Sequence, residues 1–175
     1  LEKVIASDLK VSFYTPNAVH LDMLDIETAR LMKRAGFREI RLGYESASGE
    51  FHDSYGRKYH EGGFPDTVEV LKQAGFEGRE IGVYILAGLP RQEAGEVRDS
   101  VEEARKAGVR IFIAEYSPVP GSALWEQCRA ESRLPLKEEP LFHNNSFFPM
   151  EWERFSRKEL DELKVEVREA NRRIL

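Results

Sequence analysis

The chain has 175 residues, of which 41% are hydrophobic and 33% are charged, an ordinary composition for a folded domain with a hydrophobic core. Its 26 Lys and Arg against 31 Asp and Glu give a net charge of −5. This balance excludes the basic surface of a typical nucleic-acid-binding protein. The only cysteine, Cys128, excludes an internal disulfide and any cluster held by several thiolates of this chain.

Two further features predict where the protein works. No apolar run approaches the roughly 20 residues that a membrane-spanning helix requires. The chain also does not open on a signal-peptide pattern, and cysteine is rare. We therefore expect a cytoplasmic protein with no membrane and no nucleic acid among its partners.

Strands and helices are predicted to alternate along the first two thirds of the chain. Apolar runs at residues 11–14, 40–44, 81–87 and 111–116 predict four strands. Amphipathic segments separate them, and each ends in basic residues followed by Gly36, Gly75 or Gly108. Glycine suits the position just past a helix, and cations complement the negative end of its dipole. The glycine spacing is that of one βα unit.

This alternation predicts the fold class. Successive strands joined by helices are parallel, with right-handed crossovers. A complete (β/α)₈ barrel takes about 250 residues, so four strands indicate an α/β fold that is a partial (β/α) barrel or an open sheet. We assign residues 1–130 to this unit. Residues 131–175 are predicted as an irregular loop followed by an amphipathic helix, beginning near Ser156, that packs on the barrel.

Residues alternate along each predicted strand between a helix-covered face and an open face. We assign the helix-covered face to Ile40, Leu42, Tyr44, Ile81, Val83, Ile85, Ala87, Phe112, Ala114 and Tyr116. The open face then carries Arg41, Gly43, Glu45, Gly82, Tyr84, Leu86, Gly88, Ile111, Ile113, Glu115 and Ser117. Carboxylates, a guanidinium and glycines on that face predict a cavity, and ligands bind at the carboxyl ends of parallel strands.

Plainer interpretations of these polar residues stay open. Arg41, Glu45 and Glu115 also fit a structural ion network inside the barrel. The segment after Glu45 carries a mixture suited to a metal, although such residues are more often solvated loop residues: His52, Asp53, His60 and Glu61.

Three motifs, in this order, resemble those of the radical S-adenosylmethionine (SAM) superfamily. They are residues 42–46 (Leu-Gly-Tyr-Glu-Ser), 84–90 (Tyr-Ile-Leu-Ala-Gly-Leu-Pro) and 116–122 (Tyr-Ser-Pro-Val-Pro-Gly-Ser). Residues 14–17 and Arg57 also fit. The chain is most similar to the class with an upstream cobalamin-binding domain. It resembles more loosely the methylthiotransferases and the oxygen-independent coproporphyrinogen oxidases.

The resemblance implies a six-stranded partial barrel of which this chain supplies strands three to six. It implies that Glu45, with Ser46 beside it, binds the SAM ribose, and that Arg57 holds the methionine carboxylate. It further implies contacts with adenine or sugar from Tyr84, Leu86, Ser117 and Val119. A carboxylate suits ribose hydroxyls, a guanidinium suits a carboxylate, and apolar strand ends suit a purine.

The chain departs from the superfamily in one large respect, because the CxxxCxxC loop that ligates a [4Fe–4S] cluster is absent. We therefore expect the chain to be a carboxyl-terminal part of a radical SAM enzyme that is inactive alone. SAM and the cluster would belong to the parent protein, as would cobalamin if the parent belongs to the cobalamin-binding class. No cofactor is expected on this part by itself. The expected partners are the missing amino-terminal half of the barrel and a second copy pairing through the exposed sheet edge.

Two alternatives belong to different functional classes. One is a cluster-free half-barrel that serves as a binding or scaffold module. The other is an unrelated barrel enzyme that uses Glu45 and Glu115 as acid and base without iron.

Overall fold

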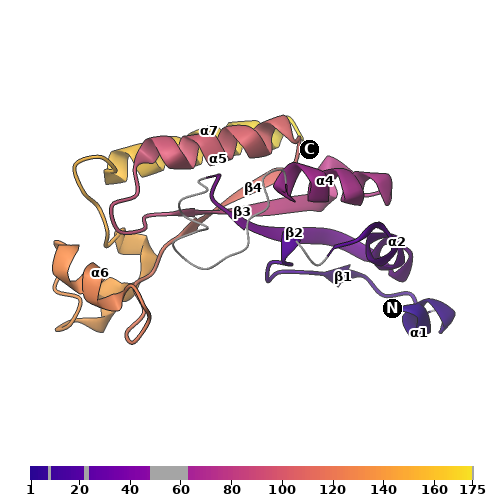
Figure 1. Ribbon diagram of the computed structural model, residues 1–175, viewed down its shortest axis with the longest axis horizontal. Coiled ribbons are helices and arrows are strands. Elements are labelled where there is room, and N and C mark those ends of the chain that lie inside the picture. Colours follow the sequence, from indigo (N-terminus) through magenta and orange to yellow (C-terminus); the bar gives the residue numbers. More distant parts are fainter. Residues whose placement is uncertain (8, 22–23, 48–62, 175) are drawn as a thin grey trace.

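A computed structural model describes residues 1–7, 9–21, 24–47 and 63–174 (Figure 1). Its sheet contains four parallel strands in the order β1-β2-β3-β4: β1 (Phe13–Tyr14), β2 (Phe37–Glu45), β3 (Ile81–Ala87) and β4 (Arg110–Glu115). The α-helices are α1 (Glu2–Ala6), α2 (Ile26–Ala35), α4 (Gly63–Gln73), α5 (Ala94–Lys106), α6 (Trp125–Glu131) and α7 (Arg157–Arg172). Short 3₁₀ helices among the described residues include η2 (Gly78–Glu80), η3 (Pro140–His143) and η4 (Asn145–Phe147). The predicted α/β partial barrel is confirmed: the strands form a curled half-barrel with helices.

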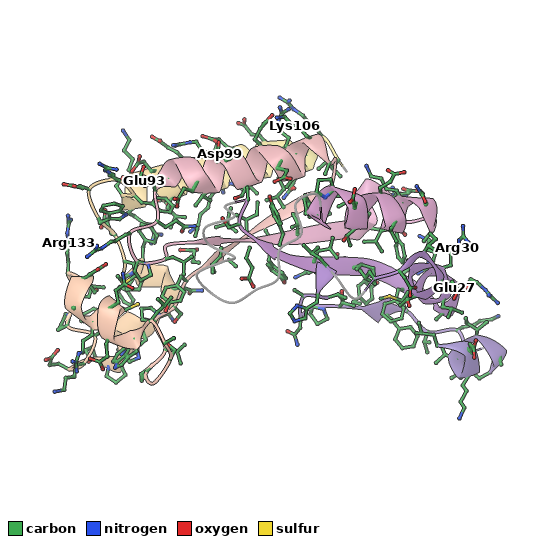
Figure 2. All side chains as sticks on the ribbon, in the orientation of Figure 1. Glu27, Arg30, Glu93, Asp99, Lys106 and Arg133 are labelled. Atoms are coloured by element: carbon green, nitrogen blue, oxygen red, sulfur yellow. The ribbon has the colours of Figure 1, made fainter. Side chains whose placement is uncertain are left out.

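Helices cover one face of the sheet. Figure 1 shows α4, α5 and α7 along the same side, and α5 and α7 both contact β4. The core between them is apolar, with Ile40, Leu42, Val83 and Ile85 fully buried. The outer helix surfaces are polar, and Figure 2 shows labelled charged side chains of α2 and α5 pointing away from the sheet. This is the amphipathic pattern that predicted the helices.

Local signals set the helix ends. The Asp25 carboxylate accepts a hydrogen bond from the Thr28 N–H at the start of α2, and Ser156 and Glu159 form a capping box at the start of α7. After α2 the chain turns at Gly36, whose φ of 99° is a left-handed conformation that glycine adopts without strain.

The prediction of which β4 residues face the helices is wrong by one position. In the observed register Val83 lies opposite Ile111, and Ile85 lies opposite Ile113. Neighbouring residues of paired parallel strands share a face, so both isoleucines lie on the helix-covered side. Phe112 and Ala114 consequently lie on the open face, where the Phe112 ring contacts Tyr84. Because successive residues of β4 are apolar on both of its faces, the sequence pattern does not indicate which face lies against the helices.

The first strand is shorter and more irregular than predicted. β1 has only two residues, and the chain pairs with β2 again at Val19. There the Val19 N–H donates to the Arg41 carbonyl (2.8 Å), and the Gly43 N–H donates to the Val19 carbonyl (3.1 Å). The residues between β1 and Val19 form part of the wall of a pocket on the open face.

A second, smaller apolar cluster lies beyond the carboxyl end of β4, around α6. It buries Cys128, Leu136 and Met150. Helix α6 begins at Trp125, and just before it the Ser122 hydroxyl donates to the Val119 carbonyl. Within the described parts of the chain, no helix has the length and apolar character needed to cross a membrane.

Candidate functional site

The open face of the half-barrel carries a pocket of about 380 Å³ toward the carboxyl ends of the strands. This volume falls in the roughly 300–1,000 Å³ range of small-molecule sites. The lining combines one carboxylate, one phenol, one amide and several small or apolar groups: Pro16, Asn17, Ala18, Gly43, Glu45, Tyr84, Leu86 and Ala114. The sequence-predicted residues Glu45, Tyr84 and Leu86 are thus brought together in one pocket.

Glu45 occupies a special backbone position at the end of β2. Its φ is 67°, a conformation that few residues other than glycine adopt, and the pairing of β2 with β3 shifts between Gly43 and Glu45. Such a shift in register re-aims the following side chain. Residues held in sparsely populated conformations cluster at functional sites. This geometry places the Glu45 side chain in the pocket lining.

Below the pocket, the floor of the open face is a connected polar network. The Arg41 guanidinium pairs with Glu39 and donates to the Tyr84 hydroxyl, and it also lies 4.4 Å from the centroid of the Phe112 ring. Arg110 pairs with the second oxygen of Glu39 at 2.9 Å. Hydrogen bonds to Glu39 and Tyr84 raise the pKa of Arg41 above its already high ordinary value. This network keeps Arg41 charged and fixed in place.

Tyr84 connects the floor to the pocket wall. Its hydroxyl accepts from Arg41 and donates to the Pro16 carbonyl (3.0 Å). Two residues earlier in β3, Gly82 leaves room for the network, because a Cβ atom there would lie 2.7 Å from the Phe112 ring. The segment around Pro16 is therefore held over the sheet by the floor beneath it.

The other predicted site residues lie outside this pocket lining. Ser46 is buried just past β2, the Ser117 hydroxyl donates to the His143 carbonyl, and Val119 is 57% exposed. Arg57 and the metal candidates His52, Asp53, His60 and Glu61 lie outside the described residues. Among the residues that the structure does describe, no group of three or more His, Cys, Asp or Glu side chains is placed to hold a metal.

Glu115 was expected on the open face and lies instead on the helix-covered side. Its carboxylate pairs with Lys164 of α7 at 2.6 Å, while the preceding residue, Ala114, lines the pocket. Glu115 and Arg41 thus pair with Lys164 and Glu39, not with each other. The interpretation of Glu45 and Glu115 as an acid and base in one site is wrong, because the two carboxylates are on opposite faces of the sheet.

Sequence reasoning missed several residues of the site. Ala114 was placed on the wrong face through the phase error in β4. Asn17 belonged to a motif that carries the resemblance but received no role. Glu39 and Arg110 of the floor network could have been found from charge alone, since Glu39 lies two residues before Arg41 and so shares its face.

The sheet and its helices have the fold of part of a radical SAM barrel. No family model matches the sequence, and no curated protein matches it. Coproporphyrinogen III oxidase (HemN) from Escherichia coli, a radical SAM enzyme, superposes with a TM-score of 0.62 at 12% identity, over 94% of this chain and 33% of that one. The resemblance predicted from the motifs is confirmed as a similarity of fold.

The radical SAM methyltransferase TsrM from Kitasatospora setae is also similar. Its structure with tryptophan substrate and a SAM analogue superposes with a TM-score of 0.60 at 16% identity, over 76% of this chain and 27% of that one. Its structure with cobalamin and a [4Fe–4S] cluster superposes with a TM-score of 0.59 at 17% identity, over 77% of this chain and 26% of that one. The chain therefore spans about a third of the length of HemN and about a quarter of TsrM.

Similarity to these enzymes raises two groups to test against the residues of this chain, the nucleoside of SAM and a [4Fe–4S] cluster. The residues suit the first and not the second. The pocket offers a carboxylate, an amide and apolar surface, which suit a nucleoside. A cluster requires several thiolates, whereas the one cysteine is buried in α6, and burial raises the pKa of the Cys128 thiol. A [4Fe–4S] site does not fit this chain by itself.

Proposed function

We propose that this chain forms the carboxyl-terminal part of a radical SAM enzyme and that its pocket binds the nucleoside part of SAM. The observation that carries the proposal is the pocket itself. It lies toward the carboxyl ends of parallel strands, where βα folds bind ligands, and it is lined by Glu45, Tyr84 and Leu86. The similarity of fold to an enzyme solved with a SAM analogue supports the choice of ligand.

Each pocket residue has a proposed role that its chemistry permits. The Glu45 carboxylate accepts hydrogen bonds from the ribose hydroxyls, and Leu86 and Ala114 provide apolar contact for the adenine. Gly43, which also lines the pocket, has no side chain to occupy it. Arg57 remains the proposed partner of the methionine carboxylate, and Ser46, Ser117 and Val119 are proposed to complete the rim when ligand binds.

The cluster is proposed to be held outside this chain. With one cysteine, the chain cannot supply the three thiolates of a CxxxCxxC loop, so a preceding segment of the parent protein would carry them. In the parent protein, a cluster held by that segment would supply the electron that cleaves SAM. The residues described here would bind and orient the adenosyl group and exclude water from it. Cobalamin is a proposal for the parent protein alone, supported by its presence in TsrM.

We further propose that the preceding half of the barrel, or a second copy of this chain when that half is missing, pairs with the β1 edge. Exposed apolar side chains gather there: Leu9, Val11 and Tyr14. The β4 edge is partly closed, because the Asn171 amide binds both the N–H and the carbonyl of Ile111 at 2.8 Å. Unpaired strand edges recruit partners. Sedimentation of the isolated chain should show a dimer, and a monomer would contradict this.

The test of the main proposal is anaerobic reconstitution of the natural protein that contains this chain, with iron and sulfide. We expect a brown protein that releases 5′-deoxyadenosine from SAM under reduction. Glu45→Ala should lower that release while leaving iron content unchanged, and the matched exposed variant Glu27→Ala on α2 should leave both unchanged. A colourless, iron-free protein would contradict the proposal and favour a cluster-free binding module.

A further inference from the structure

Gln92 is a buried side chain outside the pocket lining whose amide binds three backbone groups at the end of β3. Its Oε1 accepts from the N–H groups of Gly88 (2.7 Å) and Leu89 (3.2 Å). Its Nε2 donates to the Leu86 carbonyl (3.0 Å). The residue is 7% exposed, so its polar ends are used by the protein and not by bulk water. One side chain thus holds both sides of the turn that follows β3.

These backbone groups need such a partner because the sheet ends unevenly at this point. The Ala87 carbonyl accepts from the Tyr116 N–H on the β4 side (2.8 Å). Carbonyl directions alternate along a strand, so the Leu86 carbonyl points the other way, toward β2. There β2 ends at Glu45, which pairs with Ile85. Buried backbone groups without a partner are costly, and Gln92 satisfies them.

A second segment, residues 148–154, contacts Gln92 and the residues on either side of it. The Trp152 indole N–H donates to the Gln92 carbonyl (2.7 Å), and the Ala94 N–H donates to the Arg154 carbonyl (3.2 Å). The Phe148 ring packs so closely on Gly88 that a Cβ there would lie 2.6 Å from it, and the φ of 90° at Gly88 also requires glycine. The turn after β3 is fixed from both sides.

We infer that Gln92 is a positioning residue for the pocket: through the Leu86 carbonyl and the turn after β3, it holds the Leu86 side chain where the adenine binds. This inference rests on the proposed function, since it assigns the ligand contact to Leu86. Gln92 itself touches no ligand. Residues 148–154 hold Gln92 in place, most directly through the hydrogen bond from the Trp152 indole to the Gln92 carbonyl. A pocket wall shifted by about one ångström loses much of its complementarity to ligand.

The experiment compares three variants in the natural protein that contains this chain. Gln92→Ala removes every contact of the amide, and Gln92→Glu keeps the acceptor but loses the donor to Leu86. Trp152→Phe keeps an aromatic ring, although a smaller one, and removes the indole N–H donor. Gln73→Ala, at an exposed position on α4, is the matched control. Hydrogen exchange of the peptide covering residues 86–92 measures how well the turn is protected in the absence of ligand. Calorimetric titration with S-adenosylhomocysteine then measures the affinity of the pocket, at a temperature where every variant is folded.

We expect Gln92→Ala to speed exchange in residues 86–92 about tenfold and to weaken S-adenosylhomocysteine binding about tenfold. Gln92→Glu should retain part of the exchange protection, and Trp152→Phe should show a smaller loss of affinity. A merely structural role would lower the unfolding temperature without changing the affinity of the folded protein. Unchanged affinity in Gln92→Ala, with a wild type that binds, would overturn the inference. A wild type that does not bind would overturn the proposed function, and the assignment of Gln92 to this ligand with it.

Discussion

The two faces of the sheet use the same strands for different purposes. On the helix-covered face, Ile85 and its neighbours are fully buried in apolar packing against the helices. On the open face, one residue further along, Leu86 is only partly buried and lines a pocket above a network of paired charges. The difference indicates that the helix-covered face supplies stability, while the carboxyl end of the open face is available to a ligand.

Two substitutions on β3 test most directly whether the two faces of the sheet differ in this way. Ile85→Ala should lower the free energy of unfolding by about 3 kcal/mol, because it leaves a cavity in a fully packed core. Leu86→Ala should cost less than about 1 kcal/mol, since its side chain faces open space, yet it should weaken nucleoside binding. Urea unfolding measures the first quantity. Equal losses of stability in the two variants would contradict the assignment of the two faces.

The floor of the open face should be structural even though it is polar. Arg41→Ala should lower the free energy of unfolding by about 2 kcal/mol, because it removes the hydrogen bonds to Glu39 and Tyr84 in a partly buried setting. The exposed control Arg30→Ala on α2 should change it by less than about 0.5 kcal/mol. Thermal or urea unfolding measures both. A loss no larger than that of the control would show that the floor network is dispensable.

Two carboxylates near the strand ends, Glu45 and Glu115, should also differ according to the face on which they lie. Glu115→Gln should lower stability by about 1 kcal/mol, because Lys164 loses its ionic partner, and should leave nucleoside affinity unchanged. Glu45→Gln should do the reverse, weakening nucleoside binding with little effect on stability. Calorimetric titration and unfolding are both required. Loss of binding in Glu115→Gln would reinstate Glu115 as a site residue.

The smallest expected effect is a pH dependence at Glu80, the residue that precedes β3. Burial raises the pKa of Glu80, but the hydrogen bonds from Lys33 and the Glu77 backbone outweigh it and lower the pKa below its ordinary value of 4.5. A carboxylate with a depressed pKa stabilises the fold above the unfolded-state pKa and loses that contribution as pH falls through the folded value. Glu80→Gln should therefore cost under about 1 kcal/mol at pH 7, and the difference from wild type should shrink as pH falls below the ordinary carboxyl value of 4.5 and vanish once the folded-state carboxylate is protonated. A difference that persists in acid would contradict this.

Periodicity predicted the strands, the helices and the partial barrel because the βα units are local. The phase of β4 was not predictable, since Ile111, Phe112 and Ile113 are apolar in succession and only the register against β3 decides their faces. Motifs singled out Glu45, Tyr84 and Leu86, which the fold brings together. The role of Gln92 was invisible in sequence, because it depends on where the strand ends leave backbone groups unpaired.

The most direct test of the central claim is to find where an adenosyl ligand contacts the sheet. In the natural protein containing this chain, methyl-labelled and saturated with S-adenosylhomocysteine, NMR cross-peaks should join adenosyl protons to the methyls of Leu86 and Ala114. None should reach Ile113, which packs against the helix-covered core. Contacts to Ile113, or bound ligand without contacts to Leu86, would contradict the assignment of the open face as the nucleoside site.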